Sequence, residues 1–337
     1  MPLLQGLIGI TFLLVLWAGS YRLLTGHISL GSFVMFNTYM GILVWPMIAM
    51  GWVVNLMQRG TASLARINEL LTAEPTITAP ALPAALSAEV AGEIEFEGVE
   101  MRYGSTAALD GVTLRIPAGF TVAIVGHTGS GKSTLVNLIP RMMDPTAGTV
   151  RLDGFDLRDC DPAAIRRQIG FVPQETFLFS ATIGENIAFG VKNATAEEIR
   201  RAAEIAGLAP DIEGFPEGYQ TMVGERGLTL SGGQKQRTSI ARAILRNPRI
   251  LILDDALSSV DTLTEERILN ALENVMRGRT TIIISHRVST VRNADRIFVL
   301  EHGCIAEAGS HDELLKLGGY YADLHQKQLL EEELEAI

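Results

Sequence analysis

The first 60 residues are dominated by two long apolar runs. One covers residues 3–24 and the other residues 33–56, and the second contains no charged residue. A helix of about 20 apolar residues is long enough to cross the hydrocarbon core of a bilayer. Both runs therefore predict transmembrane helices, and residues 25–32 between them predict a short turn outside the membrane.

Other interpretations of these runs are weaker. A secretory signal peptide has a basic segment before its apolar part, whereas no basic residue precedes the first run. A buried core hairpin would rarely contain two runs of this length with so few charges. Arg59 and Arg66 follow the second run, which predicts a cytoplasmic end there, while Arg22 near the outer turn favours the opposite orientation.

The pattern changes after the second run. Residues 57–71 have the spacing of an amphipathic helix that extends the second span. Residues 72–92 are rich in Ala and Pro, and prolines forbid a continuous helix, so this stretch predicts a linker. From residue 93 the pattern alternates as in strands, which opens a predicted domain at 93–327. Residues 328–337 predict an acidic tail that is the solvated end of a helix.

Composition narrows the classes of function. The 337 residues are 47% hydrophobic and carry a formal net charge of −10. An acidic chain gains no general electrostatic attraction to nucleic acid, so nucleic acid is not an expected partner. Any phosphate that the chain binds has to be held by a local arrangement of donors. The two cysteines, Cys160 and Cys304, match no zinc-binding spacing, and we interpret them as reduced thiols.

A phosphate-binding sequence follows one of the predicted strands. Residues 126–133 read GHTGSGKS and stand between the apolar FTVAIV and the helical TLVNLI. This is G-x-x-x-x-G-K-[ST] at a strand-to-helix junction, the context that identifies a P-loop. Lys132 is expected to bridge the β- and γ-phosphates of ATP, and the Ser133 hydroxyl to bind Mg²⁺. The predicted ATP-binding residues of this loop are Gly126, His127, Thr128, Gly129, Ser130, Gly131, Lys132, Ser133 and Thr134.

An acidic residue completes the predicted site. The apolar strand ILILD, residues 250–254, ends at Asp254. A carboxylate at the end of a strand beside the P-loop strand would hold Mg²⁺ through water. The motif is weak alone, but together with the P-loop it predicts a nucleotide-hydrolysing site.

A third motif makes the resemblance to a known family specific. LSGGQKQR, residues 230–237, lies between the P-loop and ILILDD. With these motifs in this order, the chain resembles the ATPases of ABC transporters. The resemblance implies an α/β P-loop NTPase domain with an antiparallel β subdomain and an α-helical subdomain, preceded by two transmembrane α-helices. Those two helices resemble the fifth and sixth spans of an exporter half-transporter.

The resemblance implies roles for further residues. Tyr103 resembles the aromatic residue on which adenine stacks, with an ordinary strand aromatic as the alternative. Gln174 resembles the Q-loop glutamine that senses Mg²⁺ and the attacking water, and His286 the switch histidine that contacts the γ-phosphate. Residues 221–227, TMVGERG, resemble the segment that touches the partner's cytoplasmic loops. The implied magnesium ligands are Ser133, Gln174 and Asp254. The implied D-loop is Ser258, Ser259, Val260 and Asp261.

The signature segment implies a dimer. Ser231, Gly232 and Gly233 precede a predicted helix, so their N–H groups and the Ser231 hydroxyl can hold a γ-phosphate. By the resemblance, this phosphate belongs to ATP on the P-loop of a second ABC half-transporter. Closure of the two ATPase domains on ATP, and reopening after hydrolysis, would drive the membrane helices. The complete signature set is Leu230, Ser231, Gly232, Gly233 and Gln234.

One residue departs from the family pattern. The family usually has Glu directly after the aspartate of ILILD, where this chain has Asp255. That carboxylate orients the attacking water, and a displacement of about 1 Å can slow a reaction roughly 100-fold. The implied catalytic set is Asp255, His286 and Gln174, with slow hydrolysis. The departure resembles the degenerate-site subunit of heterodimeric exporters, so a heterodimer is favoured and a homodimer with two slow sites is the alternative.

Together these features predict an ATP-hydrolysing subunit of an ABC exporter, in the lipid bilayer of the cell membrane with its ATPase domain in the cytoplasm. In the family, four spans precede these two. Met1 stands where the fifth span would begin, so the first four spans are missing, which predicts a truncated product or fragment. The alternatives are an ATP-binding regulatory subunit, a non-transporting fragment, and a soluble ABC ATPase of DNA repair or translation, against which the two spans argue.

Overall fold

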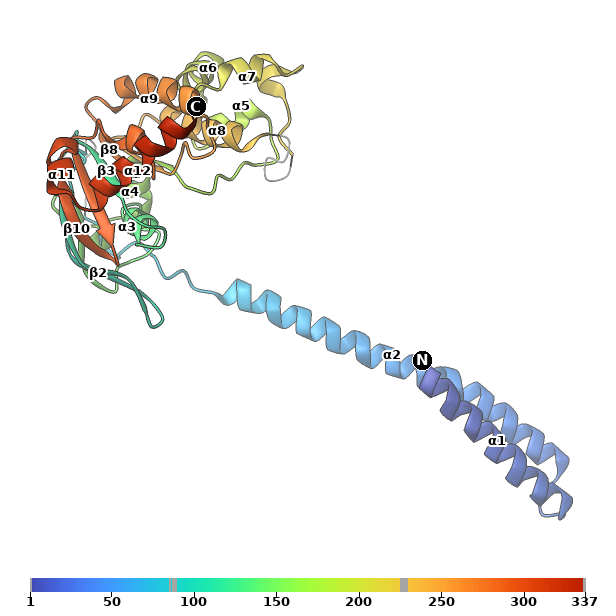
Figure 1. The fold of residues 1–337 in the computed structure, drawn as a ribbon. Coiled ribbons are helices and arrows are strands. Elements are labelled where there is room, and N and C mark those ends of the chain that lie inside the picture. The colour runs from blue at the N-terminus through green and yellow to red at the C-terminus, as the bar shows by residue number, and fades with distance from the viewer. Residues whose placement is uncertain (1, 85, 87–89, 225–229, 336–337) are drawn as a thin grey trace. The chain divides into compact units, whose positions relative to one another are not determined.

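The computed structural model describes residues 2–84, 86, 90–224 and 230–335, and the chain divides into two compact units. Met1–Pro75 form the first unit and Thr76–Ile337 the second (Figure 1). The first unit is a pair of helices, α1 (Pro2–Leu24) and α2 (Leu30–Thr72). They approach closely, since a Cβ on Gly19 of α1 would lie 2.4 Å from the ring of Phe33 in α2.

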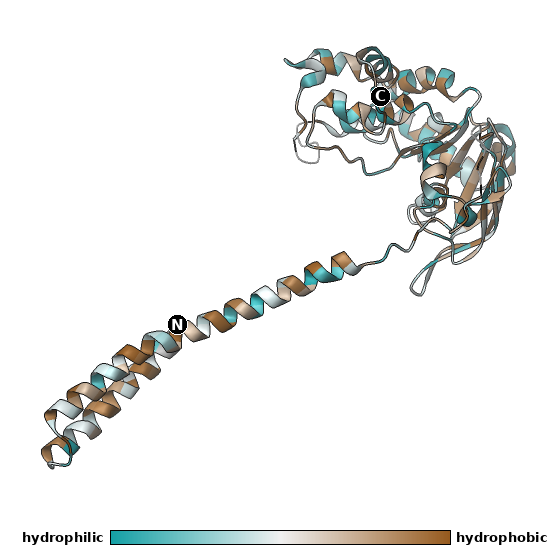
Figure 2. Cartoon of the chain, turned by 180° about the vertical axis from the view of Figure 1, so that it is seen from behind, coloured by the Kyte–Doolittle hydropathy of each residue, from teal (hydrophilic) through white to brown (hydrophobic). Residues whose placement is uncertain are grey.

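Both helices carry exposed apolar side chains, and by length and composition each can cross a membrane. Large apolar side chains such as Trp17 and Trp45 are exposed around them, and Figure 2 shows this part of the chain mostly in brown. A helix of 43 residues is about 65 Å long, roughly twice the thickness of a hydrocarbon core. The polar end of α2, with Arg59 and Arg66, therefore extends beyond the span in the same unbroken helix.

The second unit contains an antiparallel sheet and a mostly parallel sheet. The antiparallel sheet has the order β2-β1-β4-β5. Its strands are β1 (Ile94–Tyr103), β2 (Thr106–Ile116), β4 (Ala147–Leu152) and β5 (Phe155–Asp156). This sheet is the β subdomain that the sequence predicted, and Tyr103 lies at its β1–β2 turn, where it pairs with Thr106.

The larger sheet has the order β10-β9-β3-β8-β7-β6, and all of its neighbouring strands are parallel except β9 and β10. Its strands are β3 (Thr121–Val125), β6 (Ile169–Val172), β7 (Ile250–Asp254), β8 (Thr280–Ile284), β9 (Arg296–Glu301) and β10 (Cys304–Gly309). The sequence placed the strand ending at Asp254 beside the P-loop strand, and this was wrong. β8 lies between β3 and β7 and pairs with both.

Helices cover the larger sheet and form the predicted α-helical subdomain, where α5, α6, α7 and α8 gather (Figure 1). The helices of the second unit are α3 (Lys132–Leu138), α4 (Pro162–Arg167), α5 (Ile183–Ala188), α6 (Ala196–Ile205), α7 (Ala209–Glu213), α8 (Gly232–Leu245), α9 (Thr262–Met276), α10 (Val288–Val291), α11 (His311–Leu317) and α12 (Tyr320–Glu335). Short 3-10 turns lie at Leu157–Asp159 and Gly218–Gln220.

Every residue of β7 and β8 is buried. Strands covered on both faces carry nearly continuous apolar runs, which is why ILILD and TTIII do not alternate. Successive residues still point to opposite faces: Leu251 and Leu253 pack with the helices α5–α9, while Ile250 and Ile252 pack with α3 and the antiparallel sheet. The strand ends that carry the site are thus fixed from both sides.

One predicted boundary differs from the structure. The end of the predicted linker belongs to the second unit, because Val90 is buried and the N–H groups of residues 91–93 donate to the carboxylate of Asp153. The predicted tail from residue 328 is the last part of α12, where Leu329 and Leu330 are exposed.

Truncating a side chain in this core tests how far the site depends on the sheet. Ile252→Ala is expected to lower the free energy of unfolding of the second unit by about 2–5 kcal/mol, because Ile252 is 0% exposed. Scanning calorimetry of the detergent-solubilised chain measures this. Leu263→Ala is the control, since Leu263 is 77% exposed. Equal unfolding temperatures for the two variants would contradict the assignment of β7 to the core.

Candidate functional site

The P-loop forms a tight curve between β3 and α3 that only glycine fits. Gly126 and Gly131 have φ angles of 149° and 105°. A Cβ on Gly126 would lie 2.1 Å from the carbonyl oxygen of Leu300, and one on Gly131 would lie 2.4 Å from that of Ala108. Within the described residues, the N–H groups of Gly129 and Gly131 donate to no protein acceptor. The loop therefore presents unused donors at its open side, as a phosphate requires.

Lys132 folds back into this loop. Its side chain is 6% exposed, and its Nζ donates to the carbonyl oxygens of Gly126 and His127, both at 2.9 Å. Burial lowers the pKa of Lys132, and the nearby carboxylates of Asp255 and Asp254 oppose this shift. The cation is thus held by neutral carbonyls, and a phosphate would provide the counter-charge that they lack.

Ser133 and Asp254 meet across the sheet edge. Asp254 is 3% exposed and is hydrogen-bonded to the Ser133 side chain, while its Oδ1 has no partner among the described residues. Burial raises the pKa of Asp254, the Ser133 hydrogen bond opposes this, and the adjacent Asp255 adds to it. β8 lies between β3, which leads into the P-loop, and β7, which ends at Asp254. The side chains of Ser133 and Asp254 nevertheless reach each other.

This pair fits the magnesium ion that the sequence predicted. Mg²⁺ binds oxygen ligands and is held by one or two carboxylates together with substrate phosphates and waters. A buried carboxylate oxygen without a partner, beside a hydroxyl, offers such a donor set. Gln174 is exposed and, among the described residues, contacts neither Ser133 nor Asp254. The structure therefore brings two of the three predicted ligands together.

Asp255 stands where β7 ends, in a strained conformation. Its φ of 46° is unusual for a residue other than glycine, although Asp tolerates it better than most. Its N–H donates to the carbonyl of Ile284 at 3.0 Å. Its Oδ2 lies 3.5 Å from Nε2 of His286, whose side chain is 44% exposed. Asp255 and His286, predicted from distant segments, are thus neighbours.

These two residues line a cavity of about 310 Å³. Thr128 of the P-loop, Gln174 and Ser258 of the predicted D-loop also line it. The described residues around it include none of the signature segment. One cavity therefore collects P-loop, Q-loop, D-loop and switch residues of this chain, and the signature lies elsewhere.

Gln236 is a residue of this site that sequence reasoning missed. It is 4% exposed, and its Nε2 donates to the carbonyl of Asp255 at 3.3 Å and to Oγ of Ser258 at 2.9 Å. Its Oε1 accepts from the N–H of Ser259 at 2.9 Å. The signature helix α8 thus holds both Asp255 and the D-loop. A polar residue on the buried face of a predicted helix was the available signal.

The signature residues form the N-terminus of α8. Ser231 is its N-cap: the hydroxyl accepts from the N–H of Gln234 at 3.2 Å, and the Ser231 N–H donates to Oε1 of Gln234 at 3.0 Å. A Cβ on Gly233 would lie 2.9 Å from the carbonyl oxygen of Ser259. The glycine thus allows the D-loop to pack against the helix end. The hydroxyl proton of Ser231 stays available for a ligand.

Two other predicted segments lie outside the cavity. Tyr103 is 49% exposed, and its hydroxyl donates to Sδ of Met143 at 3.1 Å, which leaves the aromatic ring accessible for stacking. In the predicted partner-contacting segment 221–227, residues 225–227 lie outside the described residues. Val223 is buried and its N–H donates to the carbonyl of Ala181 at 2.9 Å.

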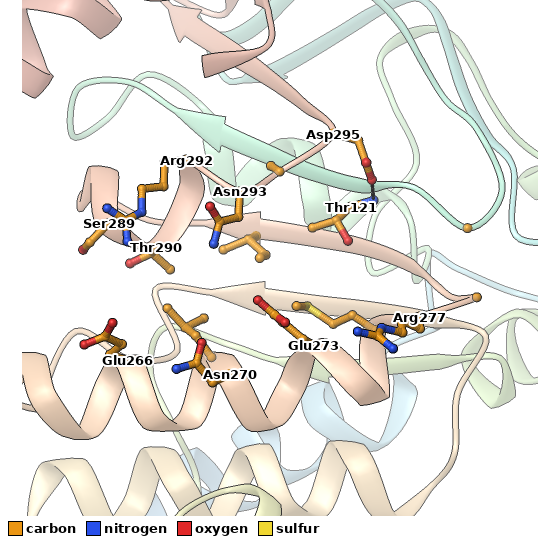
Figure 3. A pocket seen from close by; sticks show the side chains of 16 residues that line it. Thr121, Glu266, Asn270, Glu273, Arg277, Ser289, Thr290, Arg292, Asn293 and Asp295 are labelled. Atoms are coloured by element: carbon orange, nitrogen blue, oxygen red, sulfur yellow. Dashed lines mark hydrogen bonds between the residues drawn. The ribbon is translucent and has the colours of Figure 1, made fainter. Parts of the chain in front are cut away.

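A second cavity, of about 410 Å³, lies between α9 and the segment from β8 to β9 (Figure 3). Glu266 and Glu273 of α9 face Arg292 and Asn293 across it. Among the described residues that line it, none belongs to the predicted site. It therefore adds nothing to the nucleotide site.

Comparison with known proteins identifies the family. Residues 109–258 match the family model described as ABC transporter. The chain is 45% identical over 329 residues to the uncharacterized ABC transporter ATP-binding protein YknV of Bacillus subtilis, across 97% of this chain and 54% of that protein. Residues 109–258 therefore form an ABC transporter domain. It is also 43% identical over 337 residues to an ATP-dependent lipid A-core flippase of Syntrophus aciditrophicus, across 99% of this chain and 55% of the flippase.

A solved structure gives the same relationship. The structure of a bacterial Atm1-family ABC exporter with ATP bound is 37% identical, with a TM-score of 0.76, and the match covers 96% of this chain and 57% of that one. This chain thus spans little more than half the length of these relatives. The matched structure is that of an ABC exporter, and α1 and α2 are long and apolar enough to be membrane spans.

The buried charge of Asp254 predicts a trade-off between the stability of the fold and the binding of Mg-ATP. Its folded pKa lies above the unfolded value, so at neutral pH the ionised side chain destabilises the fold. Asp254→Asn is expected to raise the Tm of the second unit by about 2–4 °C without ligand and to remove the Tm increase on adding Mg-ATP. The difference in Tm without ligand should shrink as the pH falls through the folded pKa. An unchanged or lower Tm at neutral pH would contradict this.

Proposed function

We propose that this chain is the ATP-hydrolysing subunit of an ABC exporter and that it couples closure of an ATP-bound dimer to its membrane helices. One observation carries the proposal: Lys132, the Ser133–Asp254 pair, Asp255 and His286 converge where β3, β7 and β8 end. We assign residues 1–71 to the membrane part and the chain from Val90 onward, α12 included, to the ATPase domain, with the linker between them.

In this proposal each site residue either balances the charge of the nucleotide or positions a reacting group. The P-loop N–H groups and Lys132 bind the phosphates, with Tyr103 stacking on adenine. Ser133 and Asp254 would hold Mg²⁺, which would supply positive charge against the phosphates. The Asp255 carboxylate accepts a hydrogen bond from the attacking water and orients it, with Gln174 beside the same cavity. His286 donates toward the γ-phosphate. Catalysis is then mainly positioning and electrostatic stabilisation.

The surroundings of Asp255 support slow hydrolysis. Its N–H is bound to Ile284, and its carbonyl accepts from Gln236 Nε2 and from Ser258 Oγ, the latter at 2.9 Å. The backbone is thus held on both sides of the residue. The backbone of Asp255 therefore cannot move toward the cavity to make up for the methylene that Asp lacks relative to Glu. The Asp255 carboxylate thus lies farther from the attacking water than the family's Glu carboxylate would.

Restoring the longer side chain tests the slow-site proposal. Asp255→Glu is expected to raise the single-turnover rate of ATP hydrolysis at this P-loop by about 10- to 100-fold. Lys132→Ala in the same background is the control and should abolish binding and turnover. The measurement uses the full chain with its partner present. An unchanged rate in Asp255→Glu would disprove the slow site.

A second function is favoured by the same residue. An ATP-binding regulatory subunit would use the nucleotide to hold the dimer together and hydrolyse almost none. The single-turnover assay separates the two, because a regulator would retain ATP in the wild-type chain over many turnovers of the partner's site.

The position of the signature supports a dimer. We propose that the partner is a second ABC half-transporter and that the dimer is a heterodimer. Ser231 and the first N–H groups of α8 are placed at a helix N-terminus and do not line the cavity of their own chain. They are therefore free to complete a competent site on the partner. The lipid bilayer surrounds α1 and α2, and the cell membrane is the expected location.

Mixing two defective variants distinguishes the forms of dimer. Lys132→Ala removes P-loop function, and Ser231→Arg blocks the signature. In a homodimer of this chain, the mixed pair would contain one intact site and recover ATPase activity. A heterodimer predicts no recovery, because each composite site needs the other protein. ATPase assays on co-expressed variants measure this. Random pairing makes half of the dimers mixed, each with one of its two sites intact, so recovery to about a quarter of the wild-type rate would require the homodimer.

A further inference from the structure

The turn that carries His286 is held by a side chain from the C-terminal helix. Gln328 of α12 donates through Nε2 to the carbonyl of His286 and accepts at Oε1 from the N–H of Val288 at 2.7 Å. The two ends of one amide thus bind the peptide groups on either side of Arg287. Only one orientation of the amide satisfies both bonds, because its nitrogen only donates and its oxygen only accepts.

This contact replaces a helix cap that the turn lacks. α10 begins at Val288, and its N-cap residue Arg287 makes no capping hydrogen bond through its side chain. The first N–H groups of a helix need an acceptor from outside the helix. Gln328 supplies one for Val288 from 40 residues away. Two further side chains hold this turn: Oγ of Ser285 accepts from the N–H of Arg287 at 3.0 Å, and Glu265 of α9 pairs with the Arg287 side chain.

The position of α12 is fixed independently of this contact. Tyr321 is 0% exposed, and its hydroxyl lies 2.8 Å from Nδ1 of His311. The N–H of Tyr320 donates to Oε1 of Glu307 at 2.6 Å. The Tyr320 ring also lies edge-on to His127 of the P-loop, with 4.5 Å between ring centroids. One helix therefore touches both the P-loop and the switch turn.

We propose that Gln328 is a positioning residue for hydrolysis: it holds the backbone of His286 so that the imidazole stays beside Asp255. The inference rests on the proposed function. The side chain of His286 is 44% exposed, and Asp255 at 3.5 Å is its one polar side-chain partner in the described residues. The backbone must therefore set where the imidazole points. Phosphate and adenine are bound by other elements, so nucleotide affinity does not depend on this clamp.

The test compares identical substitutions at two glutamines of α12. Gln328→Met keeps the length of the side chain and removes both hydrogen bonds, while Gln326→Met is the control because Gln326 is exposed on the same helix. Gln328→Glu keeps the acceptor for Val288 and loses the donor to His286. In the full chain with its partner, single-turnover hydrolysis of Mg-ATP at this chain's own P-loop gives kcat and KM for this site apart from the partner's faster site, and amide hydrogen exchange is followed in residues 286–291.

Gln328→Met is expected to lower kcat about 10- to 100-fold with the KM for ATP within twofold of wild type. Its 286–291 amides should exchange faster. Gln328→Glu should lower kcat while keeping Val288 protected, and Gln326→Met should match wild type throughout.

Three results would overturn the inference: a kcat within twofold of wild type in Gln328→Met, unchanged exchange, or an equal change in KM and Tm that marks a general loss of structure. A wild-type chain that hydrolyses no ATP would instead disprove the proposed function. Amide hydrogen exchange in residues 286–291 would then still show whether Gln328 holds the turn. Equal exchange in the Gln328→Met and Gln326→Met variants would disprove that contact as well.

Discussion

Two opposite charges buried where the parallel strands end constrain the whole nucleotide-binding unit. Lys132 and Asp254 are 6% and 3% exposed, and neither is fully compensated by the protein: Lys132 relies on carbonyl oxygens, and one oxygen of Asp254 has no partner among the described residues. Buried charges of this kind are costly unless paired. β7, which ends at Asp254, and the loop from β3 to α3, which ends at Lys132, hold them in place, as the proposed binding of an anionic nucleotide and Mg²⁺ requires.

Around these charges, Asp255 is the residue at which several elements meet. Its peptide groups are bound by β8, by Ser258 of the predicted D-loop and by Gln236 of the signature helix, and its carboxylate faces His286. In the proposed dimer, a shift of α8 on binding of a partner's nucleotide would therefore reach Asp255 directly. The same hydrogen bonds would keep the backbone from adapting to a shorter side chain at the proposed catalytic position.

The two units follow different physical rules. In the nucleotide-binding unit, apolar side chains are buried against one another and the polar site is exposed at one edge. In α1 and α2, apolar side chains cover the outside, because the bilayer is their solvent and backbone groups are satisfied within each helix. α2 continues without a break into its polar end, so motion at that end can be transmitted to the span as a rigid element.

The sequence by itself determined the features whose signal is local. The spans follow from unbroken apolar length, the P-loop from a glycine pattern that only one backbone curve satisfies, and the buried strands from ILILD and TTIII. Tertiary structure alone decided the strand order, with β8 between β3 and β7, and the roles of Gln236 and Gln328. Their partners lie 19 and 42 residues away. No periodicity marks a single side chain that spans such a distance, since its contacts exist only after the helices have packed.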